Sequence, residues 1–200
     1  MKHKRNPDQT RQTILQAAFR EIHRNGFQAA SLSNILAKTS LTKGALYHHF
    51  PNKLALGYAL VEELLKEMVN EMWLRPLEMC EDPIQGLQDI LKTLSKQMKP
   101  EDISHGCPIN NLALEMSSTD DGFRQRINQI YDLWRKGIAN ALTRGQANGK
   151  VRQNIRPLSV ATFIVASLAG MRSIAKNFQS HEVLLSCGES VMNYLETLRP

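Results

Sequence analysis

The residues Thr42–Phe50 read TKGALYHHF and follow a short amphipathic segment across a tight turn. Thr42 can accept hydrogen bonds from the amides of a first helical turn, and Gly44 leaves room for a close backbone approach. Leu46 and Phe50 are four residues apart, so they share one helix face and can pack inward. The remaining face is cationic, aromatic and hydrogen-bonding, which suits contacts with phosphates and base edges. The segment therefore predicts a DNA-recognition helix.

The positive charge of the chain is concentrated near its N-terminus. The 200 residues carry a formal net charge of +6. Residues 1–54 contain nine Lys and Arg but two acidic residues, so they carry +7 and the rest of the chain carries −1. Concentrated positive charge gains free energy when phosphates release their counterions. This distribution favours a polyanion-binding module attached to a nearly neutral body.

Composition and targeting signals indicate a cytoplasmic protein that does not enter a membrane. A hydrophobic content of 42% is enough to bury a core. The basic segment Met1–Arg5 is not followed by an apolar run, so we expect no secretory signal. Leu158–Met171, the most apolar stretch, is short and interrupted by polar residues, so we expect it not to span a bilayer. The widely spaced cysteines fit reduced thiols: Cys80, Cys107 and Cys187.

Apolar residues recur with helical spacing throughout, so we expect an all-α fold. The first helix is predicted over about Asp8–Asn25, with Gly26 as its left-handed stop. Ser31 caps a short second helix, and a long fourth helix runs from Lys53 to about Arg75. Further helices are predicted over residues 84–98, 108–116, 121–148, 157–178 and 181–198, with a polar linker at Lys99–Cys107. The pattern predicts an N-terminal three-helix domain, residues 1–54, joined by the long helix to a larger helical domain, residues 55–200.

The sequence offers no set of residues suited to catalysis. It contains no Gly-rich phosphate loop and no G-x-S-x-G motif, and His105 is too close in sequence to Cys107 to be assigned as its base. His48 and His49 are adjacent, so on a helix they point about 100° apart and cannot chelate one ion. We therefore expect no enzymatic activity, no catalytic residues, no cofactor and no metal site.

Residues 10–56 resemble the helix-turn-helix domain of the TetR family of transcriptional repressors. The matching elements are Arg24-Asn25-Gly26-Phe27, Ser31 with Ile35 and Ala37, the TKGALYHHF segment, and Asn52-Lys53-Leu54-Ala55-Leu56. One departure is Ser40 in the turn, where the family usually has glycine. The resemblance implies a larger ligand-binding and dimerisation domain, a double-stranded DNA operator and a small-molecule effector.

The resemblance and the residue pattern together give the candidate DNA-binding residues. The resemblance places Tyr47 and Lys53 on phosphates, and Lys53 needs such a role because a cation at a helix start opposes the helix dipole. Lys43 can donate to guanine O6 and N7, and Ala45 can touch a thymine methyl group. The alternatives are a solvated charge for Lys43 and a packing role for Tyr47. The full set is Ser31, Ser33, Thr42, Lys43, Gly44, Ala45, Tyr47, His48 and Lys53.

Candidate effector residues cluster in the segment His105–Met116 and in the long helix after it. They combine apolar and hydrogen-bonding side chains, as expected of a pocket between helices. Glu115 is the most informative, since a buried carboxylate needs a partner or a cationic ligand. The apolar members of this region can equally belong to the core. The set is Cys107, Asn110, Asn111, Glu115, Tyr131 and Trp134.

Cys107 also supports an alternative hypothesis. It directly precedes Pro108, which suits a first helical turn, and a helix N-terminus stabilises a thiolate. A redox- or electrophile-sensing repressor acting through Cys107 is therefore the second interpretation. The competing interpretation is a small buried apolar residue.

The segment Val160–Met171 is apolar nearly all round, so several of its sides must be covered. A second copy of the chain supplies such cover in a homodimer, and a central core helix of a monomer is the alternative. The leading interpretation is a homodimeric, ligand-responsive repressor. It binds a palindromic operator through the helix at residues 42–50 and is released by an effector bound in the C-terminal domain.

Overall fold

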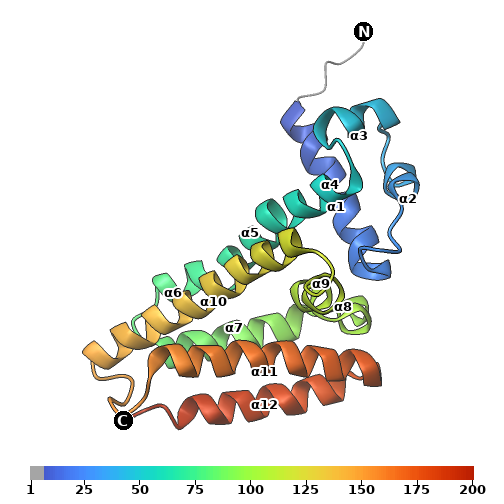
Figure 1. Cartoon of the computed structure of the whole chain (residues 1–200). Helices are drawn as coiled ribbons and strands as arrows, with labels where there is room; N and C mark the ends of the chain where they lie inside the picture. Colours follow the sequence, from blue (N-terminus) through green and yellow to red (C-terminus); the bar gives the residue numbers. More distant parts are fainter. Residues whose placement is uncertain (1–6) are drawn as a thin grey trace. The chain divides into compact units, whose positions relative to one another are not determined.

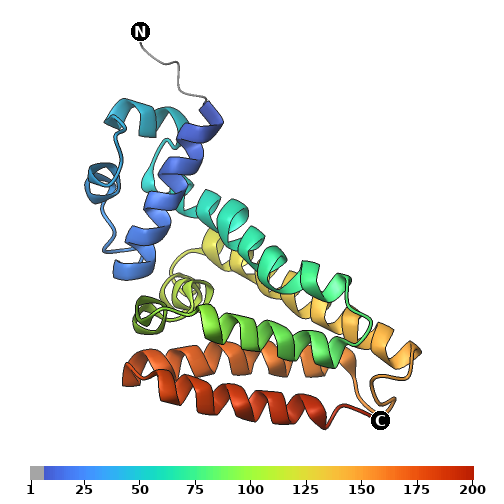
Figure 2. The ribbon, with the colours of Figure 1, turned by 180° about the vertical axis from the view of Figure 1, so that it is seen from behind.

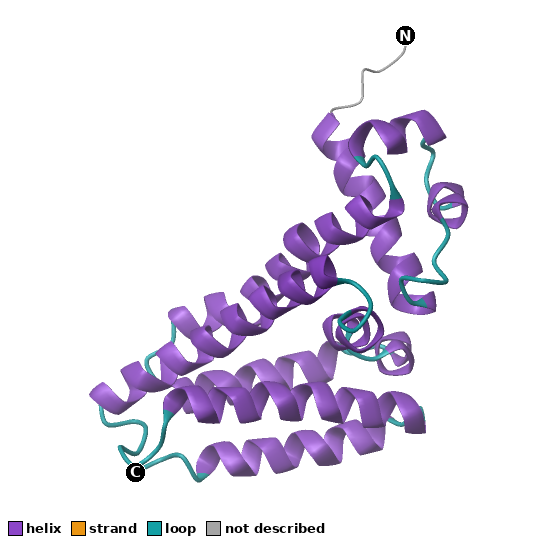
Figure 3. Cartoon of the chain, viewed as in Figure 1, coloured by secondary structure: helices purple, strands orange, loops and turns teal. Residues whose placement is uncertain are grey.

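The computed structural model describes residues 7–200, and every regular element in that range is a helix (Figures 1 and 3). The predicted all-α fold is therefore confirmed. The basic segment Met1–Arg5 lies outside the described residues. In chain order the helices are α1 (Pro7–Asn25), α2 (Leu32–Ala37), α3 (Lys43–His49), α4 (Lys53–Ala59), η1 (Leu60–Leu65), α5 (Lys66–Val69), η2 (Asn70–Leu74), α6 (Arg75–Glu78), α7 (Pro83–Gln97), α8 (Pro100–His105), α9 (Pro108–Met116), α10 (Asp121–Ala147), α11 (Pro157–Phe178) and α12 (His181–Glu196).

Contacts group the chain into two units. The first unit holds the chain up to Lys66 together with Pro108–Ile127, and the second holds Glu67–Cys107 together with Asn128–Pro200. Helix α9 therefore belongs to the same unit as the N-terminal helices, and it packs against η1. The domain boundary after residue 54 stays a prediction.

Helix α1 is the centre of the first unit, because α2, α3, α4 and η1 all contact it. Its apolar face is fully buried at Ile14, Leu15 and Ala18. The helix ends where predicted, at Asn25, since Gly26 adopts a φ of +83° that continues no right-handed helix.

A buried carboxylate joins α1 to α2. Glu21 is 1% exposed and accepts hydrogen bonds from Lys38 Nζ at 2.6 Å and Asn34 Nδ2 at 2.9 Å. The Lys38 hydrogen bond lowers the pKa of Glu21, and it outweighs burial, which raises that pKa. The short helix α2 is thus fixed by a polar contact as well as by its one buried apolar side chain, Ile35.

The backbone is helical without interruption from Lys53 to Glu78, slightly beyond the predicted end at about Arg75. Asn52 caps its start by accepting from the amide of Ala55 at 2.8 Å. Two segments of the run, η1 and η2, are π-helical, with the wider i→i+5 hydrogen bonding that occurs within longer helices.

The polar linker predicted over Lys99–Cys107 is wrong, because this segment contains the helix α8. Pro100 occupies its first turn, where its missing N–H costs nothing. The Asp102 carboxylate accepts from the amide of Lys99 at 2.8 Å, which caps the helix from within. Gly106, with a φ of +73°, ends it.

In the second unit, α7, α11 and α12 lie side by side in both views of the chain (Figures 1 and 2). Helix α11 has 22 residues and a mean hydropathy of 1.6 over its most apolar window, a third of which is buried. By length and composition alone the whole helix is long and apolar enough to cross a membrane, a test that the core helix of a soluble protein also passes.

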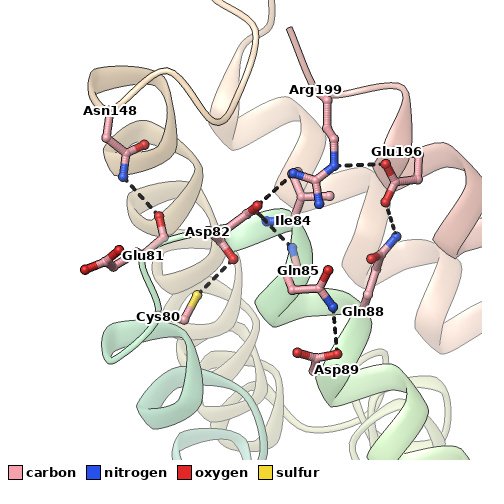
Figure 4. Close-up of polar contacts among 10 residues, drawn as sticks. All are labelled: Cys80, Glu81, Asp82, Ile84, Gln85, Gln88, Asp89, Asn148, Glu196 and Arg199. Atoms are coloured by element: carbon pink, nitrogen blue, oxygen red, sulfur yellow. Dashed lines mark hydrogen bonds and ion pairs between the residues drawn. The ribbon is translucent and has the colours of Figure 1, made fainter.

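A polar network ties the start of α7 to the end of α12 (Figure 4). Arg199 donates to Asp82 at 2.7 Å and to Glu196 at 2.9 Å, and Gln88 donates to Glu196 at 2.7 Å. Asp82 also caps α7 by accepting from two amides of its first turn. Burial raises the pKa of Asp82, but Arg199 and these amides outweigh it and lower the pKa overall. Hydrogen bonds from Gln88 and Arg199 also lower the pKa of Glu196.

We expect Arg199→Ala to lower the free energy of unfolding at pH 7 by about 0.5–1 kcal/mol, the range for partly exposed ion pairs. Lowered folded-state pKa values mean that the carboxylates stabilise the fold above their unfolded values, near pH 4, and lose this effect as the pH falls. The difference between wild type and variant should therefore shrink towards pH 3. Urea denaturation at both pH values measures it.

Lys150→Ala removes an exposed cation of the same unit and serves as the control for the change in net charge. A destabilisation by Arg199→Ala that is as large at pH 3 as at pH 7 contradicts the role of the two carboxylates.

Candidate functional site

Helix α3 has one buried face and one exposed polar face. Thr42 caps it by accepting from the amide of Ala45 at 3.2 Å, as predicted. Leu46 and Phe50 are 0% and 1% exposed, so they hold the helix against the rest of the first unit. The side chains that point away from this core are exposed: Lys43, Tyr47 and His48.

Lys43 and Tyr47 lie next to each other on the exposed face of α3. The Lys43 ammonium is 5.8 Å from the centre of the Tyr47 ring, within the range of a cation–π contact. Tyr47 is 43% exposed, so packing leaves much of its ring and hydroxyl available. Gly44 is exposed and a Cβ there would touch nothing closer than Thr42 Oγ1 at 3.9 Å. This face of the helix is therefore open to close approach by a polyanion.

Helix α2 is capped as the sequence predicts. Ser31 accepts from the amides of Ser33 at 3.2 Å and Asn34 at 3.4 Å. Its hydroxyl can still donate its own proton, so capping leaves a possible phosphate contact. Ser33 is exposed. Ala37 is exposed as well.

Lys53 is anchored within the protein at the first turn of α4. Its Nζ donates to the backbone carbonyl of Gln28 at 2.8 Å and lies 5.0 Å from the centre of the Phe27 ring. These contacts give a second reason for a cation at a helix start, besides the phosphate inferred from the sequence. An ammonium group has three donors, so two stay available for a phosphate.

The six predicted effector residues divide between the two units. Asn110, Asn111 and Glu115 lie on α9 in the first unit, whereas Cys107, Tyr131 and Trp134 lie in the second. Two of them, Asn111 and Glu115, line a small pocket of the first unit. Its full lining is Phe19, Ile22, His23, Leu60, Pro108, Asn111, Leu112 and Glu115. Its empty volume is about 240 Å³, open solvent included, which is below the usual range for a drug-sized ligand.

The Glu115 carboxylate binds the backbone of the turn that follows α1. One oxygen accepts from the amide of Phe27 and the other from the amide of Gln28, each at 2.8 Å. A Cβ on Gly26 would lie 3.0 Å from this carboxylate, so the glycine serves both its positive φ and the close approach. The partner of Glu115 is thus protein backbone, a contact between residues too far apart in sequence to be predicted from residue type or spacing.

Tyr131 and Trp134 lie near the second-unit core. Burial, with a smaller effect of the nearby Cys107, raises the pKa of Tyr131 to about 12, so its hydroxyl stays protonated at neutral pH. Trp134 is 5% exposed and its ring centre is 5.0 Å from that of Trp73. Its indole Nε1 is buried and has no hydrogen-bond acceptor among residues 7–200.

Cys107 directly precedes α9 but is buried, with 9% exposed. Thiols that react with oxidants or electrophiles lie in accessible, electropositive surroundings. The burial favours the interpretation of Cys107 as a small apolar residue over that of a redox sensor.

Two family models match this chain. Residues 14–60 match the model described as bacterial regulatory proteins, tetR family. Residues 83–190 match the C-terminal domain of the LmrA/YxaF-like transcriptional regulators.

Individual proteins that are similar to this chain are also transcriptional regulators. An uncharacterized HTH-type transcriptional regulator from the lacX 3' region of Lactococcus lactis is 29% identical over 177 residues, which cover 88% of each chain. The HTH-type transcriptional repressor DhaR of Mycobacterium sp. strain GP1 is 26% identical over 164 residues, 80% of this chain and 79% of that one. A TetR-family regulator from Cytophaga hutchinsonii has a similar structure, with a TM-score of 0.84 and 21% identity over 99% of this chain and 98% of that one.

The C-terminal match alone spans more than half of the chain, and the N-terminal match contains the capped helix α3 with its exposed polar face. These findings confirm the resemblance drawn from residues 10–56. The chain belongs to the TetR family of transcriptional regulators, with a DNA-binding helix-turn-helix and an LmrA/YxaF-like C-terminal domain.

Proposed function

We propose that this regulator is a cytoplasmic, homodimeric repressor that binds a palindromic operator through α3 and is released by a small-molecule effector bound in its C-terminal domain. The exposed cationic and aromatic face of α3 is the observation that carries the proposal. Regulators of this family are generally ligand-responsive repressors, and the Mycobacterium relative is named as a repressor. No catalytic role is proposed for any residue.

In this proposal α3 enters the major groove and the residues around it contact the DNA backbone. Lys43 and Ala45 meet base edges, while Tyr47 and Lys53 contact phosphates. The remaining members of the set lie at the starts of α2 and α3 or on the exposed face of α3: Ser31, Ser33, Thr42, Gly44 and His48. Two copies related by a two-fold axis read two half-sites about one helical turn of DNA apart.

Selection from a random duplex pool by the purified protein should enrich a two-fold symmetric motif. On that motif we expect Tyr47→Ala to weaken binding by about tenfold through loss of a phosphate contact. Lys43→Ala should relax the preference at one base pair per half-site by about 1–3 kcal/mol, the value of a specific base contact. Fluorescence anisotropy with matched and mismatched duplexes measures both effects.

Lys92→Ala on α7 is the control, since it removes an exposed cation far along the chain from α3. Sequence-specific binding through α3 is contradicted if no motif is recovered. It is also contradicted if Lys92→Ala and Lys43→Ala lose the same amount of affinity and base preference.

The effector proposal rests on the surroundings of Trp134. A buried indole N–H without an acceptor costs free energy, and a ligand that brings an acceptor removes that cost. Tyr131, one turn earlier on α10, supplies a protonated hydroxyl. We therefore propose Tyr131 and Trp134 as effector residues of the second unit. Asn110 and Asn111 are candidates within the first unit, where the half-buried Glu115 binds protein backbone instead of a ligand. Cys107 is buried.

The dimer proposal rests on the exposed side of α11. Residues spaced by four along α11 are all exposed, and this stripe consists of Leu158, Thr162, Ala166, Gly170, Ile174 and Phe178. Leu158, Ile174 and Phe178 are 48%, 48% and 66% exposed. A Cβ on Gly170 would meet nothing within 4 Å, so another helix can approach closely there. A contiguous exposed apolar surface of this kind is typical of a protein–protein interface.

We expect the wild type to sediment as a dimer and Ile174→Glu to sediment as a monomer at micromolar concentration, because dimerisation would bury the new charge. Sedimentation equilibrium measures the molecular mass. Met79→Glu is the matched control, since Met79 is 88% exposed and lies outside α11 and α12. A monomeric wild type, or a dimer in both variants, is inconsistent with an interface on α11.

A further inference from the structure

The turn after α1 receives two side chains from distant parts of the chain, and both bind the same dipeptide. The Glu115 carboxylate accepts from the amides of Phe27 and Gln28, each at 2.8 Å. The carbonyl of Gln28, which belongs to the next peptide unit, accepts from Lys53 Nζ at 2.8 Å. All of these residues belong to the first unit. The turn therefore lies between a fixed carboxylate and a cation that the proposed function places on a phosphate.

From this arrangement we infer that Glu115 is a positioning residue for operator binding. Its carboxylate fixes the Phe27–Gln28 backbone, and the Gln28 carbonyl in turn fixes the Lys53 ammonium where it meets a phosphate. The inference rests on the proposed function, because it needs Lys53 to contact DNA. It also gives Glu115 a role different from the effector contact expected from the sequence.

The geometry favours this role over simple packing. A carboxylate with both oxygens bound to backbone amides makes charge-assisted hydrogen bonds, which are stronger than neutral ones. Lys53 would otherwise be a flexible side chain that loses rotamer freedom on binding DNA. Holding its ammonium at Gln28 and over the Phe27 ring in the free protein reduces that loss.

Glu115 and the residues that it positions lie in segments matched by two different family models. Glu115 lies within residues 83–190, which match the C-terminal domain model, while Phe27, Gln28 and Lys53 lie within residues 14–60. Asn111, one turn before Glu115 on α9, lines the same small pocket. A shift of α9 along its axis would move the Glu115 carboxylate away from the two amides.

The test is Glu115→Gln on the motif recovered by selection. The amide side chain keeps the shape and one acceptor oxygen, but its NH₂ group cannot accept from a backbone amide. We expect about tenfold weaker operator binding, and a plot of log K against log salt concentration whose slope falls by roughly 0.9, the value of one phosphate contact. Partial unfolding lowers the active fraction without changing this slope, so the slope separates positioning from stability.

Asp121→Asn is the matched control. Asp121 is an exposed carboxylate of the same unit, so its neutralisation changes the net charge by the same amount. Loss of a negative charge by itself strengthens attraction to DNA, so Asp121→Asn should bind as tightly as wild type or slightly more tightly. Weaker binding by Glu115→Gln then has the opposite sign from the general electrostatic effect.

Two further variants complete the test. Lys53→Met should show the same reduced slope, and Glu115→Gln added to Lys53→Met should reduce it no further, because the contact is already lost. Glu115→Asp keeps the charge but is one methylene too short to reach both amides, so it provides a second variant with a reduced slope should Glu115→Gln fold poorly.

An unchanged slope in Glu115→Gln and Glu115→Asp, or a further reduction in the double variant, overturns the inference. Absence of any selected motif with the wild type overturns the proposed function instead, so the two failures are distinguishable.

Discussion

The arrangement of the DNA-binding helices depends on the burial of Phe27 in the turn after α1. Its ring lies edge-on to that of Phe123, with centres 4.6 Å apart. A Cβ on Gly57 would come within 2.5 Å of the Phe27 ring and 2.6 Å of the Phe123 ring. The two rings therefore lie directly on the backbone of α4, which only glycine allows at this position. Because the ring is fixed, so are the backbone groups of the same turn that Glu115 and Lys53 bind.

The sequence was sufficient to predict helix α3 and its exposed face because everything that defines them is local. Thr42 caps α3 within its own first turn, and the four-residue spacing of Leu46 and Phe50 decides which face is buried. The exposed face is what remains. The same reasoning located the starts of α2, α9 and α11 and the glycine that ends α1. The signal for α8 was also local, in Pro100 and Asp102, but a proline after a polar stretch equally predicts a break.

The parts that the sequence did not predict depend on contacts between distant residues. Glu115 lies 88 residues from Phe27. We interpreted it as a ligand contact from its residue type, which cannot reveal a backbone partner so distant in the sequence. Lys53 lies 25 residues from Gln28, so its dipole penalty alone pointed to an external anion. The division of the effector residues between two units is likewise a property of packing. Side-chain type limits what a residue can bind, while tertiary structure decides what it does bind.

The contacts of α9 explain how a helix matched by the C-terminal domain model can bear on DNA binding. It packs on η1 and gives its carboxylate to the turn after α1, while Asn111 borders a pocket too small for a typical ligand. Any ligand contact that changes the position of α9 changes the distance from Glu115 to two amides, and hydrogen bonds weaken steeply as their geometry departs from the optimum. A small displacement of α9 therefore weakens the hold of Glu115 on the turn after α1. It thereby changes the position of the Lys53 ammonium that this turn holds.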